Sequence, residues 1–223
     1  MVRELQLADQ KSAETRLRLL LDLFHDVFGQ DSILVDSSKK TRYLERLLQV
    51  HDIDLRVIHL IKDVRAFTVS AVDTAKRRQH GKGTDGGFGS RLPDPVKFRP
   101  LRAFRSWYWR NREIETYLEV QRLKRFRVGY EALCLQTSSI VGELSRFLAI
   151  DYEPSMLDIG RSQGHAALGN RMRLQSDKRK AIQYDNRWFY RNEWLVPYVL
   201  FRTIAKYNMT AVYSHTKGGV WSD

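Results

Sequence analysis

Apolar residues recur along this chain in two patterns, and each pattern predicts one type of secondary structure. A recurrence every three to four residues is typical of an amphipathic helix, whereas a short apolar run between polar segments is typical of a buried strand. The first pattern predicts helices at residues 12–28, 42–49, 64–76, 101–124 and 137–148, and a final amphipathic helix within 187–201. The second pattern predicts strands at residues 32–36, 55–61 and 126–133.

The order of these elements predicts the fold class. The strands at 32–36 and 55–61 are each followed by a loop and a helix. This order favours parallel strands joined by right-handed crossovers, with helices on both faces of the sheet. We therefore predict an α/β fold, a three-layer sandwich with a parallel central sheet. In such a sheet, ligands bind beyond the carboxyl ends of the strands.

The composition indicates one globular domain that spans residues 1–223. The chain is 43% hydrophobic, which is enough to form a sizeable core. One segment departs from this pattern, because residues 77–100 contain five glycines and three prolines among many cations. Such a composition predicts a long mobile loop, which we interpret as a lid or an acceptor-binding loop.

The charge balance indicates an anionic partner. Lysine and arginine outnumber aspartate and glutamate by 38 to 26, which gives a formal net charge of +12. Phosphate esters, nucleic acid, acidic glycans and anionic lipid all fit this excess. No apolar run is long enough to span a membrane, so we expect a soluble chain and favour a cytoplasmic location. No His or Cys pair has metal-ligand spacing, so no metal is expected.

Candidate binding chemistry lies just after the predicted strand at 55–61, in the sequence IHLIKDVRAFTVS. Lys62 and Arg65 follow the strand directly, and Ser70 lies two turns into the next helix. A phosphate above this helix start would contact two cations, a hydroxyl and the positive end of the helix dipole. The alternative interpretation is a solvated basic turn with a serine on the helix surface.

This segment resembles the 3′-phosphate-binding segment of sulfotransferases that use 3′-phosphoadenosine 5′-phosphosulfate (PAPS). In that family an apolar strand is followed by Arg-Asp-Pro-Arg and by a helix with a serine eight residues after the first arginine. Lys62 and Val64 stand where the family has arginine and proline. The stretches ILVDSSKK, VGYEAL and HAALGNRMR, with IQYDNRW downstream, are similar to other family segments in the same order, so the resemblance covers most of the chain.

The resemblance implies a P-loop-like sulfotransferase fold that transfers a sulfuryl group from PAPS, as co-substrate, to an acceptor hydroxyl or amine. The implied donor ligands are Lys39, Lys62, Arg65, Ser70, Tyr130, Arg171 and Arg173. Lys39 would approach the phosphate side, Lys62 and Ser70 would bind the 3′-phosphate, and Tyr130 would pack near the adenine. Asp36, or alternatively His165, would be the general base. The acceptor class, whether glycan, peptide, lipid or small alcohol, stays open.

One part of the family pattern has no counterpart in this chain. These sulfotransferases begin with a strand and a Pro-x-x-Gly-Thr-Thr loop that binds the 5′-phosphosulfate, and residues 1–31 contain nothing similar. We therefore expect the domain to lack its first strand, to have unpaired strand edges beside exposed apolar side chains, and to be inactive as it stands.

Two other functions compete with this interpretation. The net charge and the aromatic residues interleaved with arginine at 107–112 and 187–191 also fit a basic nucleic-acid-binding protein without catalytic activity. The structural interpretation of these stretches is that they form helices with one buried aromatic face and one solvated charged face. A P-loop enzyme is disfavoured, because in GHAALGNR the residues Asn170 and Arg171 replace the Lys and Ser or Thr of that motif.

Overall fold

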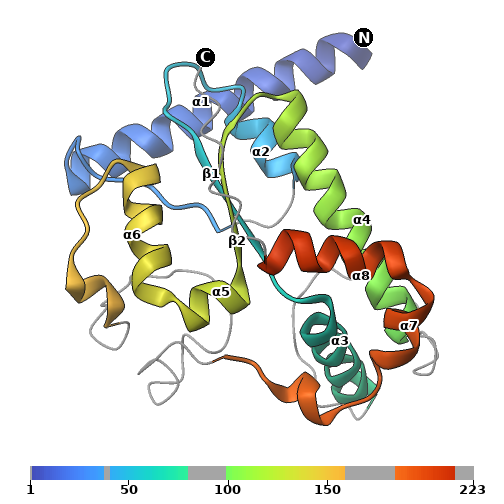
Figure 1. Ribbon diagram of the computed structural model, residues 1–223. Helices are drawn as coiled ribbons and strands as arrows, with labels where there is room; N and C mark the ends of the chain where they lie inside the picture. Colours follow the sequence, from blue (N-terminus) through green and yellow to red (C-terminus); the bar gives the residue numbers. More distant parts are fainter. Residues whose placement is uncertain (1, 38–40, 80–98, 159–183, 214–223) are drawn as a thin grey trace. The chain divides into compact units, whose positions relative to one another are not determined.

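The computed structural model describes residues 2–37, 41–79, 99–158 and 184–213 (Figure 1). The chain divides into two compact units, Met1–Leu55 and Arg56–Asp223. The basic loop predicted at 77–100 lies mostly outside the described residues. No helix in the described ranges combines the length and the apolar character that crossing a bilayer requires.

The first unit contains two helices, α1 (Val2–Phe28) and α2 (Thr41–Leu47). The prediction that the first helix ends before Gly29 is confirmed. Gly29 has a φ of +92°, a left-handed conformation that glycine adopts without a Cβ clash, and its amide donates to the carbonyl of His25. The sequence pattern at 42–49 also predicts α2 correctly, within two residues at either end.

The strand predicted at residues 32–36 is wrong, because this segment has no regular secondary structure. Its three apolar side chains are exposed, with Ile33 at 51%, Leu34 at 40% and Val35 at 81%. A strand needs a hydrogen-bonded partner, and the described part of this unit contains only helices and irregular chain. The strand propensity of these residues was not enough to form a strand without a partner.

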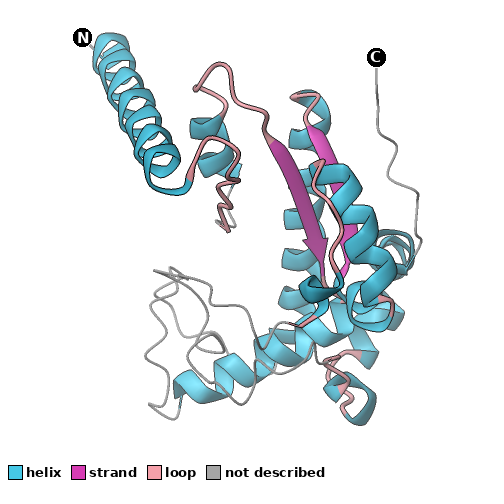
Figure 2. Cartoon of the chain, turned by 90° about the vertical axis from the view of Figure 1, so that its left-hand side faces the viewer, coloured by secondary structure: helices cyan, strands magenta, loops and turns pink. Residues whose placement is uncertain are grey.

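The second unit is built on a parallel pair of strands, β1 (Arg56–Ile61) and β2 (Lys124–Gly129), in register from Arg56–Lys124 to Ile61–Gly129. The crossover between them contains α3 (Val64–Gln79) and α4 (Arg99–Val120). The predicted strand at 55–61, its parallel pairing and the helix that follows it are confirmed (Figures 1 and 2).

The third predicted strand, 126–133, is only partly correct. β2 stops at Gly129, and α5 (Tyr130–Leu135) follows, then α6 (Thr137–Leu148), whose bounds match the predicted helix. In the first turn of α5, the carboxylate of Glu131 accepts from the amide of Asp63. The sequence pattern could not reveal this long-range partner.

Helices cover both faces of the two strands. On one face, Phe126 and Val128 pack against Ile140 of α6. On the other, Ile61 packs with Phe104 and Trp107 of α4 and with residues of the C-terminal segment. The described chain is thus a mixed α/β structure, mostly helical, with a small parallel sheet (Figure 2). The larger three-layer sandwich that we predicted is not confirmed.

The outer edge of β1 has no strand partner among the described residues, as expected for an incomplete sheet. Ile58 and Leu60 are 44% and 50% exposed on the face that they share with Phe126 and Val128. Those two β2 residues are buried, because α6 covers their half of the face.

The single C-terminal helix predicted within 187–201 is also wrong. The segment forms a short 3₁₀ helix, η6 (Arg187–Tyr190), and then α7 (Leu195–Leu200). A break at Phe201 separates α7 from α8 (Arg202–Asn208) and from a π-helical turn, η7 (Met209–Tyr213). Tertiary contacts explain this bending, because Trp188, Trp194 and Tyr198 all turn towards the interior. A further 3₁₀ helix, η2 (Pro154–Leu157), follows α6.

Candidate anion-binding site

The candidate site lies beyond the carboxyl ends of β1 and β2. Because these strands are parallel and Ile61 is in register with Gly129, the residues that follow each strand lie close together. Lys62 and Asp63 connect β1 to α3, while Tyr130 and Glu131 begin α5. The position agrees with the general rule for ligand sites in parallel sheets.

Lys62 is the centre of the site. Its Nζ atom lies 2.6 Å from Oδ2 of Asp185, 3.5 Å from Oγ of Ser70 and 5.4 Å from the ring centroid of Tyr130. The lysine side chain is 29% exposed, so solvent and solutes can reach it. The structure therefore brings together three of the predicted donor ligands, Lys62, Ser70 and Tyr130.

Arg187 is a cation of this site that sequence reasoning missed. Its Nη2 atom donates to Ser70 Oγ at 3.2 Å, and its Nη1 atom lies 2.9 Å from Oδ2 of Asp73. The side chain is 51% exposed. Arg187 lies 117 positions from Ser70, so spacing could not connect them. The sequence signals were the stretch IQYDNRW, which contains Arg187, and the arginines interleaved with aromatic residues at 187–191.

The carboxylate of Asp185 lies between Lys62 and Arg187. The carboxylate of Asp185 accepts from Lys62 on Oδ2 and from Arg187 on both oxygens, at 2.7 and 2.8 Å. These hydrogen bonds, that from Arg187 first, hold the pKa of Asp185 well below its usual range. A lysine with a bidentate arginine is also a typical donor set for a phosphate. We call Lys62, Ser70, Tyr130, Asp185 and Arg187 the Lys62 cluster.

Arg65 faces a different set of partners. Its Nε and Nη2 atoms donate to Asp63, at 2.7 Å for the Nη2–Oδ2 pair, and its guanidinium lies 3.7 Å from the ring centroid of Trp188. Its side chain is only 15% exposed. The guanidinium thus holds the β1–α3 turn to the C-terminal segment, and its hydrogen bonds go to Asp63 and Tyr213 rather than to the Lys62 cluster.

The start of α3 is capped by side chains rather than open to a ligand. The amide of Asp63 donates to Glu131, that of Val64 donates to Asn208 Oδ1 at 2.8 Å, and that of Arg65 donates to Asp63 Oδ1. The sequence interpretation placed a phosphate above this helix start, where free amides would bind it. Since these three amides already have acceptors, an anion near Lys62 would be bound by side chains.

Asp63 is the buried centre of this capping network. Its side chain has no solvent exposure, and its Oδ2 atom accepts from Tyr213 at 2.7 Å and from Asn208 at 3.0 Å, in addition to Arg65. Burial opposes ionisation, but the hydrogen bonds and the charge of Arg65 outweigh it and lower the pKa of Asp63. The network therefore holds an ionised carboxylate beneath the Lys62 cluster.

Comparison with known proteins assigns no family. No protein-family model matches the chain, no curated protein is significantly similar to it, and no solved structure matches its fold.

The remaining predicted site residues belong to the first unit or lie outside the described residues. Asp36, the predicted general base, lies in the irregular exposed segment of the first unit. Lys39, Arg171 and Arg173 lie outside the described residues, as does the alternative base His165. No group of three or more potential metal ligands occurs in the described ranges.

The titration of Glu131 predicts how stability depends on pH. Burial, partly offset by backbone hydrogen bonds, raises the pKa of Glu131 from 4.5 to about 7. Because its pKa is raised in the folded state, the contribution of protonated Glu131 to folding stability is complete below pH 4.5 and is lost as the pH rises through 7. The free energy of unfolding should therefore fall by roughly 3 kcal/mol across this window.

Urea unfolding of the wild type and of Glu131→Gln at several pH values between 4.5 and 8 measures this effect. The variant retains an acceptor oxygen for the Asp63 amide but does not titrate, so its stability should change less across the window. Parallel pH profiles for the two proteins would rule out a titrating Glu131.

Proposed function

We propose that this chain is a sulfotransferase-type domain that binds the 3′-phosphoadenosine end of PAPS, although without the 5′-phosphosulfate loop it is expected to be inactive as it stands. One observation carries the proposal: Lys62 Nζ and Ser70 Oγ, eight positions apart, lie 3.5 Å from each other beyond the end of a parallel strand. This spacing is also the one on which the family resemblance rests. In the proposal, Lys62, Ser70 and Arg187 bind the 3′-phosphate.

The adenine would lie near Tyr130, whose ring is 5.4 Å from Lys62 Nζ. Burial is the first cause of the raised pKa of Tyr130, so its hydroxyl is neutral and the ring offers an uncharged surface for stacking. Lys39, Arg171 and Arg173 remain predicted ligands of the donor. Arg65 has a different role in the proposal, because it positions the β1–α3 turn that carries Lys62.

The proposed reaction is an in-line transfer. The acceptor oxygen or nitrogen attacks the sulfur of PAPS, the bond from sulfur to the phosphate oxygen breaks, and 3′-phosphoadenosine 5′-phosphate leaves. The acceptor proton goes to a general base, for which Asp36 remains the predicted residue. Cations around the donor stabilise the charge that develops on the leaving phosphate.

We further propose that the two strands are part of the predicted three-layer P-loop-like sandwich. Their parallel pairing and the helices on both of their faces support this. The free edge of β1 supports it too, because a further strand could pair there and cover Ile58 and Leu60.

The nucleic-acid alternative is less well supported. Two of the aromatic residues that suggested it, Trp107 and Trp188, are 3% and 6% exposed and belong to the core. Stacking on bases needs accessible rings. Trp109 and Phe189 are accessible, at 63% and 59%. Strongly salt-dependent binding of generic DNA or RNA, without saturable nucleotide binding, would favour this alternative.

Titration calorimetry with 3′-phosphoadenosine 5′-phosphate tests the proposal. We expect saturable binding, and a Kd that rises at least about tenfold in Lys62→Ala, because a charge-assisted hydrogen bond is lost. Lys76→Ala is the matched control: this lysine is on α3, as Ser70 is, and is 51% exposed, but it pairs with Glu193, so the Kd of this variant should stay within about twofold of the wild type.

Asp185→Asn tests whether a phosphate competes with the Asp185 carboxylate for Lys62 and Arg187, or whether the cluster serves the fold alone. If the phosphate takes the place of the Asp185 carboxylate between Lys62 and Arg187, removing that charge should lower the Kd several-fold. Absence of nucleotide binding in the wild type and in Asp185→Asn would refute the proposed function.

A further inference from the structure

One face of α7 is apolar and exposed, the reverse of the usual orientation of a surface helix. Its residues Leu195, Val196, Val199 and Leu200 are 45%, 63%, 66% and 64% exposed. At 100° per residue these positions span an arc of about 140°. Pro197 and Tyr198 lie on the other side and face the core. Single exposed aliphatic residues are ordinary, whereas a continuous face of them marks an interaction site.

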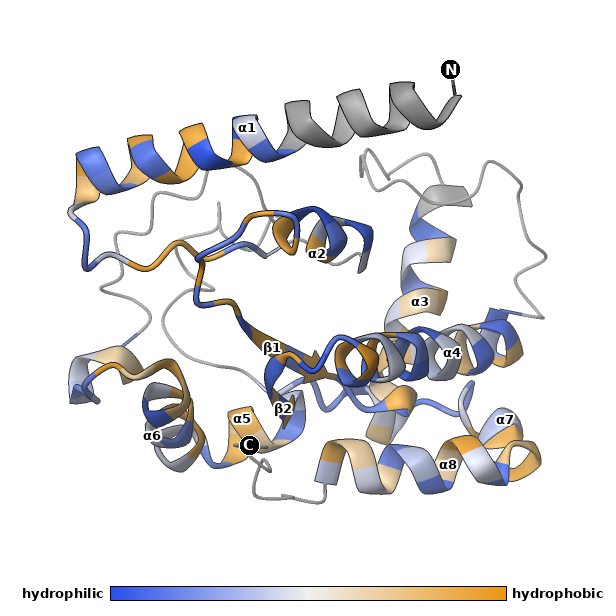
Figure 3. Ribbon diagram, turned by 90° about the horizontal axis from the view of Figure 1, so that it is seen from above, coloured by the Kyte–Doolittle hydropathy of each residue, from blue (hydrophilic) through white to orange (hydrophobic). Residues whose placement is uncertain are grey.

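The α7 face is held in position by the core behind it. Tyr198 packs edge-on against Phe104 at 6.3 Å and against Trp194 at 5.6 Å between ring centroids. The indole N–H of Trp194 donates to the carbonyl of Trp188 at 2.8 Å. Because these contacts fix the inward side of α7, the helix cannot rotate its aliphatic face inwards without breaking them. Figure 3 shows α7 beside α4 and α8, with strongly apolar colouring.

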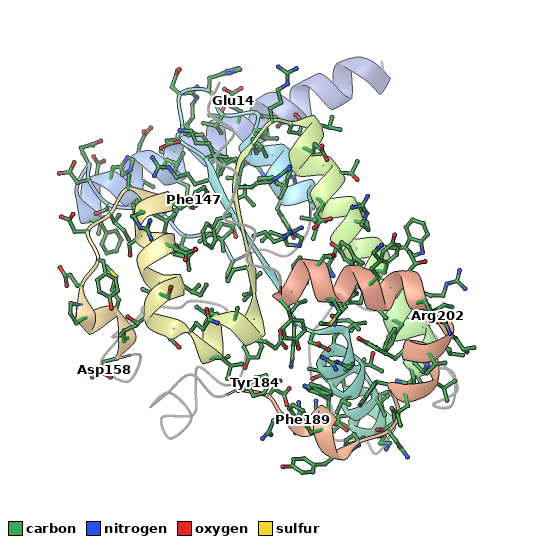
Figure 4. The ribbon with its side chains drawn as sticks, viewed as in Figure 1. Glu14, Phe147, Asp158, Tyr184, Phe189 and Arg202 are labelled. Atoms are coloured by element: carbon green, nitrogen blue, oxygen red, sulfur yellow. The ribbon has the colours of Figure 1, made fainter. Side chains whose placement is uncertain are left out.

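Cations lie beside the C-terminal end of α7. Phe201, which directly follows α7, lines a pocket with Leu101, Arg102, Arg105 and Ser106 of α4. Arg102, Arg105 and Arg202 are exposed. Figure 4 shows Arg202 at the turn between α7 and α8.

The stretches of chain that carry these cations contain no acidic residue of their own. Residues 99–112 and 194–213, which include α7, α8 and the first half of α4, contain no Asp or Glu. The cations in these two stretches are Arg99, Arg102, Arg105, Arg110, Arg112, Arg202 and Lys206. Arg112 pairs with Glu115 at 3.2 Å, whereas Arg105 and Arg202 are exposed cations near the aliphatic face.

We propose that the α7 face binds the surface of an anionic phospholipid bilayer. The aliphatic side chains would enter the boundary between headgroups and acyl chains, and the arginines would contact lipid phosphates and carboxylates. Long arginine side chains suit this arrangement, since the stem can lie along apolar surface while the guanidinium stays with the headgroups. The inference is independent of the Lys62 cluster and of the proposed reaction.

Other occupants fit the same observations less well. Nucleic acid offers phosphates but no apolar phase for four aliphatic side chains. A second copy of the chain, related by two-fold symmetry, would bring two surfaces of the same positive charge together, which is unfavourable. An anionic bilayer supplies both the apolar phase and the negative charge.

Sedimentation with vesicles tests the proposal. We expect the full chain to bind vesicles of 70% phosphatidylcholine and 30% phosphatidylserine, in about 0.1 M salt, and to bind pure phosphatidylcholine vesicles far more weakly. The double variant Val196→Asp, Val199→Asp should bind the mixed vesicles at least about tenfold more weakly, because it places two charges in the apolar phase. Its thermal midpoint should match the wild type, because both sites are more than 60% exposed.

Val120→Asp is the matched control. Val120 is 71% exposed at the far end of α4, about 27 Å along the helix from Arg102. Vesicle binding by this variant should equal that of the wild type. Arg105→Gln and Arg202→Gln should each weaken binding about fivefold, and this difference should shrink at high salt.

Several results would overturn the proposal. These are equal binding to neutral and anionic vesicles, no vesicle binding by the wild type, and unchanged binding by the double aspartate variant. Self-association that the double variant abolishes, without vesicle binding, would assign the α7 face to a second copy instead. Binding to DNA alone would assign the arginines to nucleic acid.

Discussion

Asp63→Ala is expected to lower the free energy of unfolding by about 3–5 kcal/mol, because it removes one partner of a buried ion pair. Arg65 would retain its charge at 15% exposure, against the ring of Trp188, with no carboxylate beside it. Asn208 and Tyr213 would lose an acceptor, and α3 would lose the cap on the amide of Arg65. Urea unfolding at pH 7, monitored by tryptophan fluorescence, measures the change.

Asp73→Asn is the matched control for this prediction. Asp73 also accepts from two arginines, but Arg187 and Arg191 are 51% and 30% exposed. Ion pairs that water can screen contribute little, so this substitution should cost at most about 1 kcal/mol. Equal effects of the two substitutions would show that the burial of Asp63 does not determine the stability of the turn.

Gly129→Ala is expected to destabilise the protein by about 3 kcal/mol or more, at the upper end of overpacking effects. A Cβ at this position would overlap the backbone carbonyl of Val212, with the carbonyl carbon 2.9 Å away. The backbone of Gly129 itself would accept alanine, since its φ is −76° and its ψ is 135°. The expected cost therefore comes from forcing η7 away from the end of β2.

Gly142→Ala provides the opposite expectation with the same chemical change. Gly142 lies inside α6, and a Cβ there would meet no atom within 4 Å. Replacing a glycine inside a helix by alanine, where the Cβ has room, should stabilise the fold by about 0.5–1 kcal/mol. Thermal or urea unfolding of the two variants compares them directly. A stable, unperturbed Gly129→Ala would contradict the close approach of η7 to β2.

The Lys62 cluster and the capping network of Asp63 show why the candidate site was only partly predictable. Lys62 and Ser70 were found from a local spacing, and the structure places them together because a strand and its following helix fix their geometry. Asp185 and Arg187 were missed, since their contacts with Lys62 and Ser70 span 123 and 117 positions. The availability of the α3 amides was misjudged for the same reason, because Glu131 and Asn208 reach them from distant elements.

The sequence by itself determined the local elements of this protein. The helices α2, α3 and α6 and the strand β1 follow from hydrophobic periodicity, which is a property of neighbouring residues. The order of elements indicated a parallel sheet, but not that β1 pairs with β2. Gly29 likewise predicted the end of α1, because the left-handed conformation that ends the helix there is a local property of glycine.

The tertiary structure alone decided which apolar segments are buried and which cations serve the fold. Residues 32–36 and 55–61 have similar apolar patterns, yet only the second becomes a strand, because only it has a hydrogen-bonded partner in the described structure. Arg65 and Arg187 are both arginines near the same turn. Arg65 pairs with the buried Asp63, whereas Arg187 pairs with Asp73 and stays 51% exposed. Burial and pairing are long-range quantities, so a linear pattern cannot determine them.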